Sequence, residues 1–197
     1  YTPKKTSISV SKSWEDANNQ DGIRPNDVIV KLFVDGEDTG KTLTLSQGNQ
    51  WTGSFTDLDQ FNGGQQIRYT VEETAVEGYT SAITGDMGEG YVITNTHTPA
   101  VTEVAGRKTW KDNNDQDGVR PESITISLMK NGQVLQSETV TANDDWAWSF
   151  ENLPKYENGN EITYSITENV VEGYTTEYDG TNVINSYTPQ KTSVTVN

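Results

Sequence analysis

The feature that most constrains the fold of this chain is an internal repeat. The segment Lys12-Ser13-Trp14 returns about 96 residues later as Lys108-Thr109-Trp110. Further segments recur in the same order: 19–25 with 115–121, 69–73 with 164–168, and 77–80 with 172–175. The 197 residues therefore contain two copies of one domain, and each copy must build its own core from about half of the chain.

The correspondences also suggest domain boundaries. We expect a first domain over residues 1–98, in which residues 1–5 repeat the exit of a preceding unit, and a second domain over residues 99–189. Residues 190–197 match the entry of the first copy, so they predict the start of a following unit. The chain is thus expected to be an excerpt of a longer tandem array, with short Thr/Pro linkers that are stiffer than Gly/Ser tethers.

Apolar and polar residues alternate within each copy. Val28, Val30 and Leu32 show this period of two in the first copy, as do Ile124 and Ile126 in the second. Clusters of Gly, Asn and Asp separate such runs, and no stretch has a convincing helical period. The pattern predicts an all-β chain in which each copy is an antiparallel β-sandwich of about seven strands.

Each copy also places polar residues on strand faces that are otherwise apolar. A period of two puts Lys12 on the face of Trp14, and it puts Glu73, rather than the adjacent Glu72, on the apolar face of its strand. Asn95 points inward in the same way. The second copy repeats the arrangement with Lys108, Glu168 and Asn185. An unpaired buried charge costs several kcal/mol, so these groups must be paired or neutralised.

Lys, Glu and Asn together are the components of an intramolecular amide-forming reaction. Burial favours the neutral amine, which is a nucleophile, and the protonated carboxylic acid, which can polarise a carbonyl group and shuttle a proton. The side-chain amide is an electrophile that can lose ammonia, and packing supplies the effective concentration. The alternative for each triad is a buried Lys–Glu salt bridge beside a hydrogen-bonded Asn.

The motifs around these residues resemble a known family. Lys-x-Trp near the start of each copy, Tyr-x-Val/Ile-x-Glu in its middle and Ile/Val-x-Asn before a Tyr-Thr-Pro-like exit are similar to the B-type (CnaB-like) repeats of Gram-positive collagen-binding surface adhesins. The resemblance implies two tandem β-sandwich domains of reversed immunoglobulin-like (prealbumin-like) topology. It also implies spontaneous isopeptide bonds assisted by an acid: Lys12 with Asn95 under Glu73, and Lys108 with Asn185 under Glu168.

The resemblance further implies a structural function. The repeats would be stalk or spacer units of a cell-wall-anchored, extracellular surface adhesin, rigidified against force and proteases by the bonds. The alternative is an adhesive module that itself binds a host extracellular-matrix protein. We expect a monomer whose partners are neighbouring repeats, with host ligand binding by another region. We expect no cofactor and no enzyme activity beyond single-turnover, autocatalytic bond formation.

Composition argues against several other functions. The formal charge of −15 at pH 7 disfavours nucleic acid as a partner. The chain has no cysteine and one histidine, His97, which removes thiol chemistry and leaves few groups for metal binding or histidine-based catalysis. No apolar run approaches the ~20 residues that span a bilayer, so we expect no membrane insertion by this chain.

Three weaker signals favour structural explanations. Segment 113–118 resembles the start of a calcium loop, but Ile124 occupies the position of the last ligand, and we expect a turn without a metal. His97 is expected to pack at the exit of the first copy. Trp148 replaces Gly53 of the first copy, and we expect it to be partly exposed.

Overall fold

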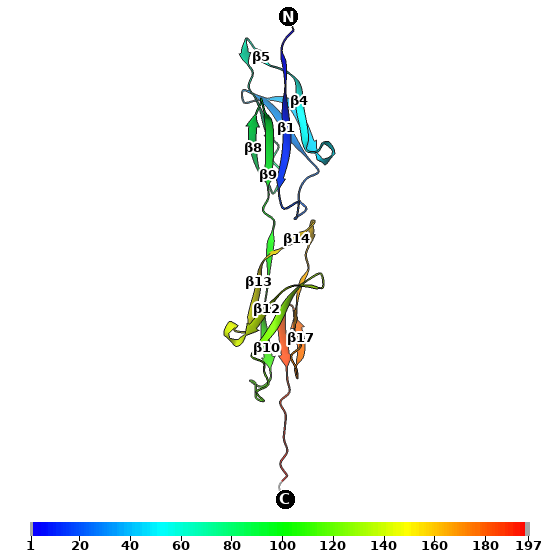
Figure 1. Cartoon of the computed structure of the whole chain (residues 1–197), viewed down its shortest axis with the longest axis vertical. Coiled ribbons are helices and arrows are strands. Elements are labelled where there is room, and N and C mark those ends of the chain that lie inside the picture. The colour runs from blue at the N-terminus through cyan, green and yellow to red at the C-terminus, as the bar shows by residue number, and fades with distance from the viewer. Residues whose placement is uncertain (1, 196–197) are drawn as a thin grey trace. The chain divides into compact units, whose positions relative to one another are not determined.

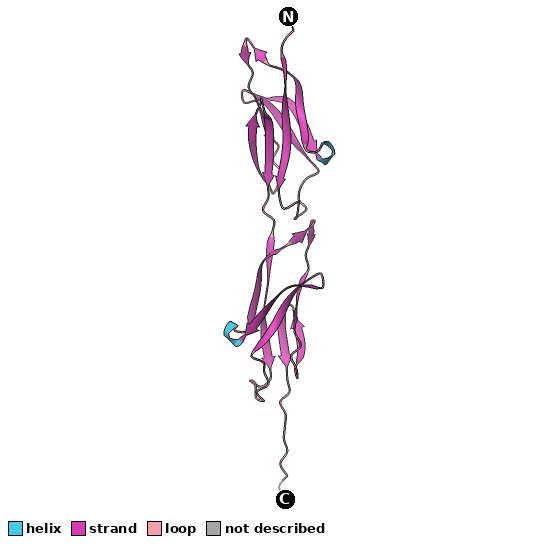
Figure 2. Ribbon diagram, viewed as in Figure 1, coloured by secondary structure: helices cyan, strands magenta, loops and turns pink. Residues whose placement is uncertain are grey.

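The computed structural model describes residues 2–195, which form two compact units, one built mainly from residues up to 99 and the other from residues 100 onward. Almost all of the regular structure is β-strand (Figure 2). The helical segments are the short 3-10 helices η1 (Gln47–Asn49) and η2 (Ala142–Asp144). Within residues 2–195, none of the helices has the length and apolar character needed to cross a membrane. The prediction of an all-β fold is confirmed.

Each unit contains strands in the same order along the chain (Figure 1). The first unit has β1 (Lys5–Glu15), β2 (Asp27–Val34), β3 (Glu37–Ser46), β4 (Thr52–Asp59), β5 (Phe61–Asn62), β6 (Gln65–Gln66), β7 (Tyr69–Glu73), β8 (Thr80–Asp86) and β9 (Gly90–Thr96). The second has β10 (Val101–Lys111), β11 (Ser123–Lys130), β12 (Gln133–Thr141), β13 (Ala147–Pro154), β14 (Tyr156–Glu157), β15 (Asn160–Glu161), β16 (Tyr164–Glu168), β17 (Thr175–Asp179) and β18 (Asn182–Ser186).

The predicted boundaries at 98/99 and 189/190 stay predictions. The predicted entry of a further unit, residues 190–197, has no strand over 190–195, and its last residues, 196 and 197, lie outside the described part of the chain. Residue 1, in the predicted exit of a preceding unit, also lies outside it.

Each unit is a sandwich of a four-stranded and a three-stranded sheet. The strand orders are β4-β1-β9-β8 and β3-β2-β7 in the first unit, and β13-β10-β18-β17 and β12-β11-β16 in the second. The number of sheet strands agrees with the prediction, and each unit adds a two-stranded hairpin, β5–β6 or β14–β15. Alternate residues of the sheet strands point inward, so Ile8, Val30, Leu32 and Ile93 are fully buried in the first unit.

The first and last strands of each unit pair in parallel, so the expectation of a wholly antiparallel sandwich was wrong at this position. In the first unit Lys12 lies opposite Ile93 and Trp14 lies opposite Asn95. Parallel neighbours need a long crossover, which here is the whole intervening domain. Because β1 and β9 run in the same direction, the chain enters the sheet at one end and leaves it at the other.

Trp148 lies in the core of the second unit with 4% exposure, so the expectation of partial exposure was wrong. On the neighbouring strand its partner is Gly106, where an added Cβ would lie 2.0 Å from the backbone oxygen of Thr181 and 2.7 Å from Cζ2 of Trp148. In the first unit the equivalent pair is Val10 and Gly53. The large and small residues are exchanged between the two strands, and the indole together with the backbone of Thr181 occupies the space that a side chain at Gly106 would need.

Candidate functional site

Strands of both sheets bring the first triad together in the core. Lys12 comes from β1, Asn95 from its neighbour β9, and Glu73 from the end of β7 in the opposite sheet. Asn95 is fully buried, and the side chains of Lys12 and Glu73 are 0% and 1% exposed. Glu72 is exposed, as the period of two indicates. The structure thus brings into one region the three residues that the sequence singled out.

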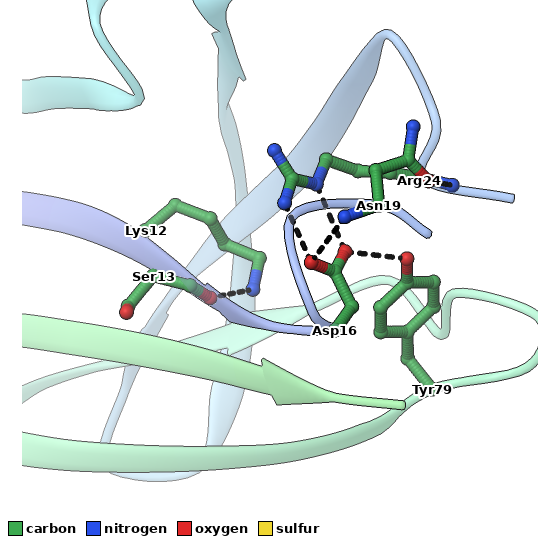
Figure 3. Close-up of polar contacts among 6 residues, drawn as sticks. All are labelled: Lys12, Ser13, Asp16, Asn19, Arg24 and Tyr79. Carbon is green, nitrogen blue, oxygen red and sulfur yellow. Dashed lines mark hydrogen bonds and ion pairs between the residues drawn. The ribbon is translucent and has the colours of Figure 1, made fainter. Parts of the chain in front are cut away.

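The amino group of Lys12 lies among oxygen atoms and an aromatic ring. Its Nζ is 3.7 Å from Oε1 of Glu73, an ion-pair distance, and it donates hydrogen bonds to the carbonyl oxygens of Ser13 at 3.0 Å and Ile93 at 3.4 Å (Figure 3 shows the first). It also lies 4.1 Å from the ring centroid of Trp14. Burial lowers the pKa of Lys12 to about 8, although the charge of Glu73 acts in the opposite direction.

The residues of the second triad come from the equivalent strands of the second unit. Lys108 comes from β10, Asn185 from β18 and Glu168 from the end of β16. Lys108 Nζ donates a hydrogen bond to Oε1 of Glu168, and both side chains are 0% exposed. Burial lowers the pKa of Lys108, against the opposing influence of Glu168. The hydroxyl of Thr176 on β17 donates a further hydrogen bond, 3.3 Å long, to Oε2 of Glu168.

Several polar atoms of the triads lack hydrogen-bond partners. Within residues 2–195, neither the amide nitrogen nor the amide oxygen of Asn95 or Asn185 has a hydrogen-bond partner, and the same holds for both carboxylate oxygens of Glu73. A buried polar group left unpaired costs about 1–3 kcal/mol. Hydrogen bonding therefore gives no reason for an asparagine at these fully buried positions.

A second polar cluster lies beside the first triad (Figure 3). Asp16, 2% exposed, accepts hydrogen bonds from Arg24 (Nε at 2.9 Å, Nη2 at 2.6 Å), from the Tyr79 hydroxyl at 2.8 Å and from the Asn19 backbone at 2.9 Å. The bonds from Arg24 are the main cause that lowers the pKa of Asp16 to about 2. The guanidinium also lies 5.3 Å from the ring centroid of Trp14, the ring that Lys12 contacts as well.

The second unit repeats this cluster around Asp112. Its carboxylate accepts hydrogen bonds from Arg120 (2.9 and 2.7 Å), from the Tyr174 hydroxyl (3.0 Å) and from the Asp115 backbone (3.0 Å). The pKa of Asp112 falls to about 2, mainly through Arg120, and burial raises the pKa of Tyr174 to about 12. Sequence reasoning missed this cluster. The available signal was the recurrence of Asp, Arg and Tyr at matching positions in both copies.

Two of the weaker sequence signals, segment 113–118 and His97, lie in a turn and at the end of a strand. Asp115 accepts a hydrogen bond from the backbone N–H of Arg120, which closes the turn that resembles a calcium loop. In the part of the chain that the structure describes, no group of three or more acidic or histidine side chains could hold a metal ion. The ring nitrogens of His97 lie 2.9 Å from the carboxylate of Asp21 and 2.9 Å from the carbonyl oxygen of Gly78. His97 thus packs against its own repeat at the exit of β9.

Comparisons with known proteins find the same repeat. The family model of the Cna protein B-type domain matches residues 8–96 and 104–186. A collagen adhesin of Staphylococcus aureus is 46% identical over 198 residues; the match covers 100% of this chain and 17% of that protein. The crystal structure of two B repeat units of the collagen-binding protein of Staphylococcus aureus has a TM-score of 0.85 at 46% identity, and the match covers 96% of this chain and 51% of that one.

Proposed function

The chain belongs to the family of Cna protein B-type domains, and we propose that its two repeats are structural spacer units of a bacterial surface adhesin, each closed by a Lys–Asn isopeptide bond. The observation that carries the proposal is the meeting of a buried amine, carboxyl and carboxamide at equivalent positions of both repeats. The corresponding location is the outside of the cell, with the full protein anchored to the cell wall. Host ligand binding belongs to other regions of the protein.

The bond forms by displacement at the asparagine side chain. A proton passes from the ammonium of Lys12 to the carboxylate of Glu73, and the resulting amine attacks Cγ of Asn95. One C–N bond forms between Nζ and Cγ, and the bond from Cγ to the amide nitrogen breaks. Glu73 passes its first proton to that nitrogen, which leaves as ammonia. The second proton that Nζ loses on becoming an amide passes to Glu73, which ends as a carboxylic acid. The pKa of about 8 at Lys12 supports this step, because a lowered pKa increases the fraction of neutral amine near neutral pH.

The product would also remove the unpaired groups of the triad. An isopeptide bond has one N–H donor and two acceptor positions on its carbonyl oxygen, three in all, in place of the four hydrogen-bonding positions of the asparagine amide. A neighbouring carboxylic acid has a complementary O–H donor and C=O acceptor. Glu73 and Asn95, whose side-chain polar atoms have no hydrogen-bond partners before reaction, can therefore form hydrogen bonds with each other once the bond exists.

The mechanical consequence follows from the strands that the bond joins. Lys12 and Asn95 lie on the first and last strands of the unit, which are parallel neighbours. The bond closes a loop of about 80 residues, which in the loop-entropy model stabilises the fold by about 4 kcal/mol. Tension applied at the two ends of a unit then passes through a covalent link, and local opening that would admit a protease is suppressed.

The experiment that tests the proposal is an intact mass measured under denaturing conditions. We expect the chain to be lighter than its sequence mass by two molecules of ammonia, one for each triad. The matched control is Lys108→Arg, which keeps a positive charge but cannot form the bond and should lack one ammonia only. A wild-type mass equal to the sequence mass would overturn the proposal.

A second candidate function is direct binding of a host extracellular-matrix protein by these repeats. It is favoured by the name of the Staphylococcus aureus relative, a collagen adhesin. Binding of the two-repeat chain to immobilised collagen and other matrix proteins separates the two functions. Saturable, tight binding by this chain alone would replace the spacer function, and its absence together with the ammonia loss supports the spacer.

A further inference from the structure

In the second repeat, two side chains of the edge strand β17 contact the buried acid Glu168. Thr176 and Tyr178 lie two residues apart on β17, so both side chains point to the same side of that strand. The hydroxyl of Thr176 donates to Oε2 of Glu168 at 3.3 Å, and the hydroxyl of Tyr178 accepts a hydrogen bond from the backbone N–H of Glu168 at 3.1 Å. One contact fixes the carboxylate and the other fixes the backbone that carries it.

These contacts span the two sheets of the unit. Glu168 ends β16, the outermost strand of the three-stranded sheet, whereas β17 is the outermost strand of the four-stranded sheet. An edge strand has backbone groups without partners in its own sheet. On β16 one of these groups is the N–H of Glu168, which donates its hydrogen bond to the Tyr178 hydroxyl. With Oε2 held by Thr176, Oε1 remains for the amino group of Lys108, to which it is hydrogen bonded.

The first repeat lacks this support. Thr176 lies opposite Asn185 in the strand register, and the residue opposite Asn95 is Ser81. Ser81 therefore takes the place of Thr176, and its hydroxyl makes no hydrogen bond to the carboxylate of Glu73. By the same register the equivalent of Tyr178 is Ile83, which has no hydroxyl. Neither carboxylate oxygen of Glu73 has a hydrogen-bond partner within residues 2–195. The distance from Glu73 to Lys12 is 3.7 Å, beyond a direct hydrogen bond.

We propose that Thr176 is a positioning residue for Glu168, aided by Tyr178, and that the Lys108–Asn185 bond therefore forms faster than the Lys12–Asn95 bond. This inference rests on the proposed function. Proton transfer needs the acceptor oxygen within hydrogen-bond reach of the donor, and a carboxylate held by a second hydrogen bond spends more time in that orientation. Thr176 touches the acid and takes no part in the bonds that form and break.

The test compares rates of bond formation in the full chain. Cells expressing it receive a short pulse of isotope-labelled amino acids and are lysed into denaturant at intervals, and mass spectrometry of the digested chain quantifies the cross-linked and free Lys108 peptides. Thr176→Val keeps the shape and removes the hydroxyl, and Thr176→Ser keeps the hydroxyl. Because water can partly replace a hydroxyl at this exposed edge, we expect the Val variant to form the Lys108–Asn185 bond about tenfold more slowly.

The Ser variant keeps Tyr178 on the same strand, which the first repeat lacks, so we expect it to retain the wild-type rate to within about twofold. The Lys12–Asn95 bond should form at an unchanged rate in both Thr176 variants. If Thr176 acts by positioning the acid, the cross-linked Val variant should unfold at the same denaturant concentration as the cross-linked wild type. A purely structural role would instead lower the stability of the cross-linked Val variant.

The reciprocal change provides a test that does not depend on weakening the second repeat. Ser81 already has a hydroxyl, so introducing the missing tyrosine by Ile83→Tyr, with Ser81→Thr to reproduce the pair on β17, should accelerate the Lys12–Asn95 bond several-fold. Equal rates in wild type and Thr176→Val, or no acceleration by the double substitution, would overturn the inference while leaving both bonds in place. Absence of both bonds from the wild-type chain would instead refute the proposed function.

Discussion

Replacing Asn185 with leucine should remove the cross-link of the second repeat without leaving a buried charge unpaired. Leucine has a similar size but cannot be attacked by an amine, and the ion pair between Lys108 and Glu168 remains. The loop between positions 108 and 185 has about 77 residues, so the loop-entropy model gives a loss of about 4 kcal/mol in the free energy of unfolding. Breaking the ion pair itself would add a further cost of about 3–5 kcal/mol, which this substitution avoids.

The assay is urea unfolding of the full chain, followed for each repeat by hydrogen exchange and mass spectrometry. With a denaturant slope of about 1–2 kcal/mol per molar urea, the midpoint of the second repeat should fall by about 2–4 M. The first repeat should not change, and Asn95→Leu should give the mirror result. If Asn185→Leu unfolds at the wild-type urea concentration and differs in mass only by the substitution, no bond existed to be lost and the reasoning is wrong.

Three further outcomes are expected. Glu73→Gln should block the bond of the first repeat and Glu72→Gln should not, as read from intact mass; the opposite result would mean that the inward face of β7 is misassigned. The pKa of Asp112 lies at about 2, below its ordinary value of 3.8, so its contribution of roughly 2 kcal/mol is complete above about pH 4 and is lost as the pH falls toward 2. Asp112→Asn should flatten this acid dependence in unfolding measurements, and an unchanged profile would contradict the assignment. Gly106→Val should destabilise the second repeat by about 1–3 kcal/mol, because its Cβ would overlap both the backbone oxygen of Thr181 and the indole of Trp148. Trp148→Gly relieves the second contact only, so it should recover part of the loss; additive losses would refute a packing contribution from the indole.

The sequence alone could place the candidate triads because strand periodicity is a local property. Inward orientation of Lys12, Glu73 and Asn95 follows from a period of two and from their apolar neighbours, and burial in the structure confirms it. The recurrence of the same residue types in the second copy argued against a coincidental arrangement. The choice of Glu73 over Glu72 rested on the same alternation.

Other features depended on contacts between distant segments. The parallel pairing of β1 with β9 joins strands at opposite ends of a domain, and a single copy has no local signal for strand direction. Trp148 was misjudged because its burial depends on Gly106, a residue on another strand. The hydrogen bond from Tyr79 to Asp16 likewise joins segments that are distant in sequence.

The exchanged pairs Val10 with Gly53 and Gly106 with Trp148 bear on how an array of repeats can evolve. Recombination between two copies in one gene produces hybrid units when the crossover falls between the codons for β1 and β4. One hybrid combines valine with tryptophan and has too much volume for its core, whereas the other combines two glycines and leaves a cavity. We expect selection to remove both, so this packing constraint helps neighbouring repeats to keep distinct sequences.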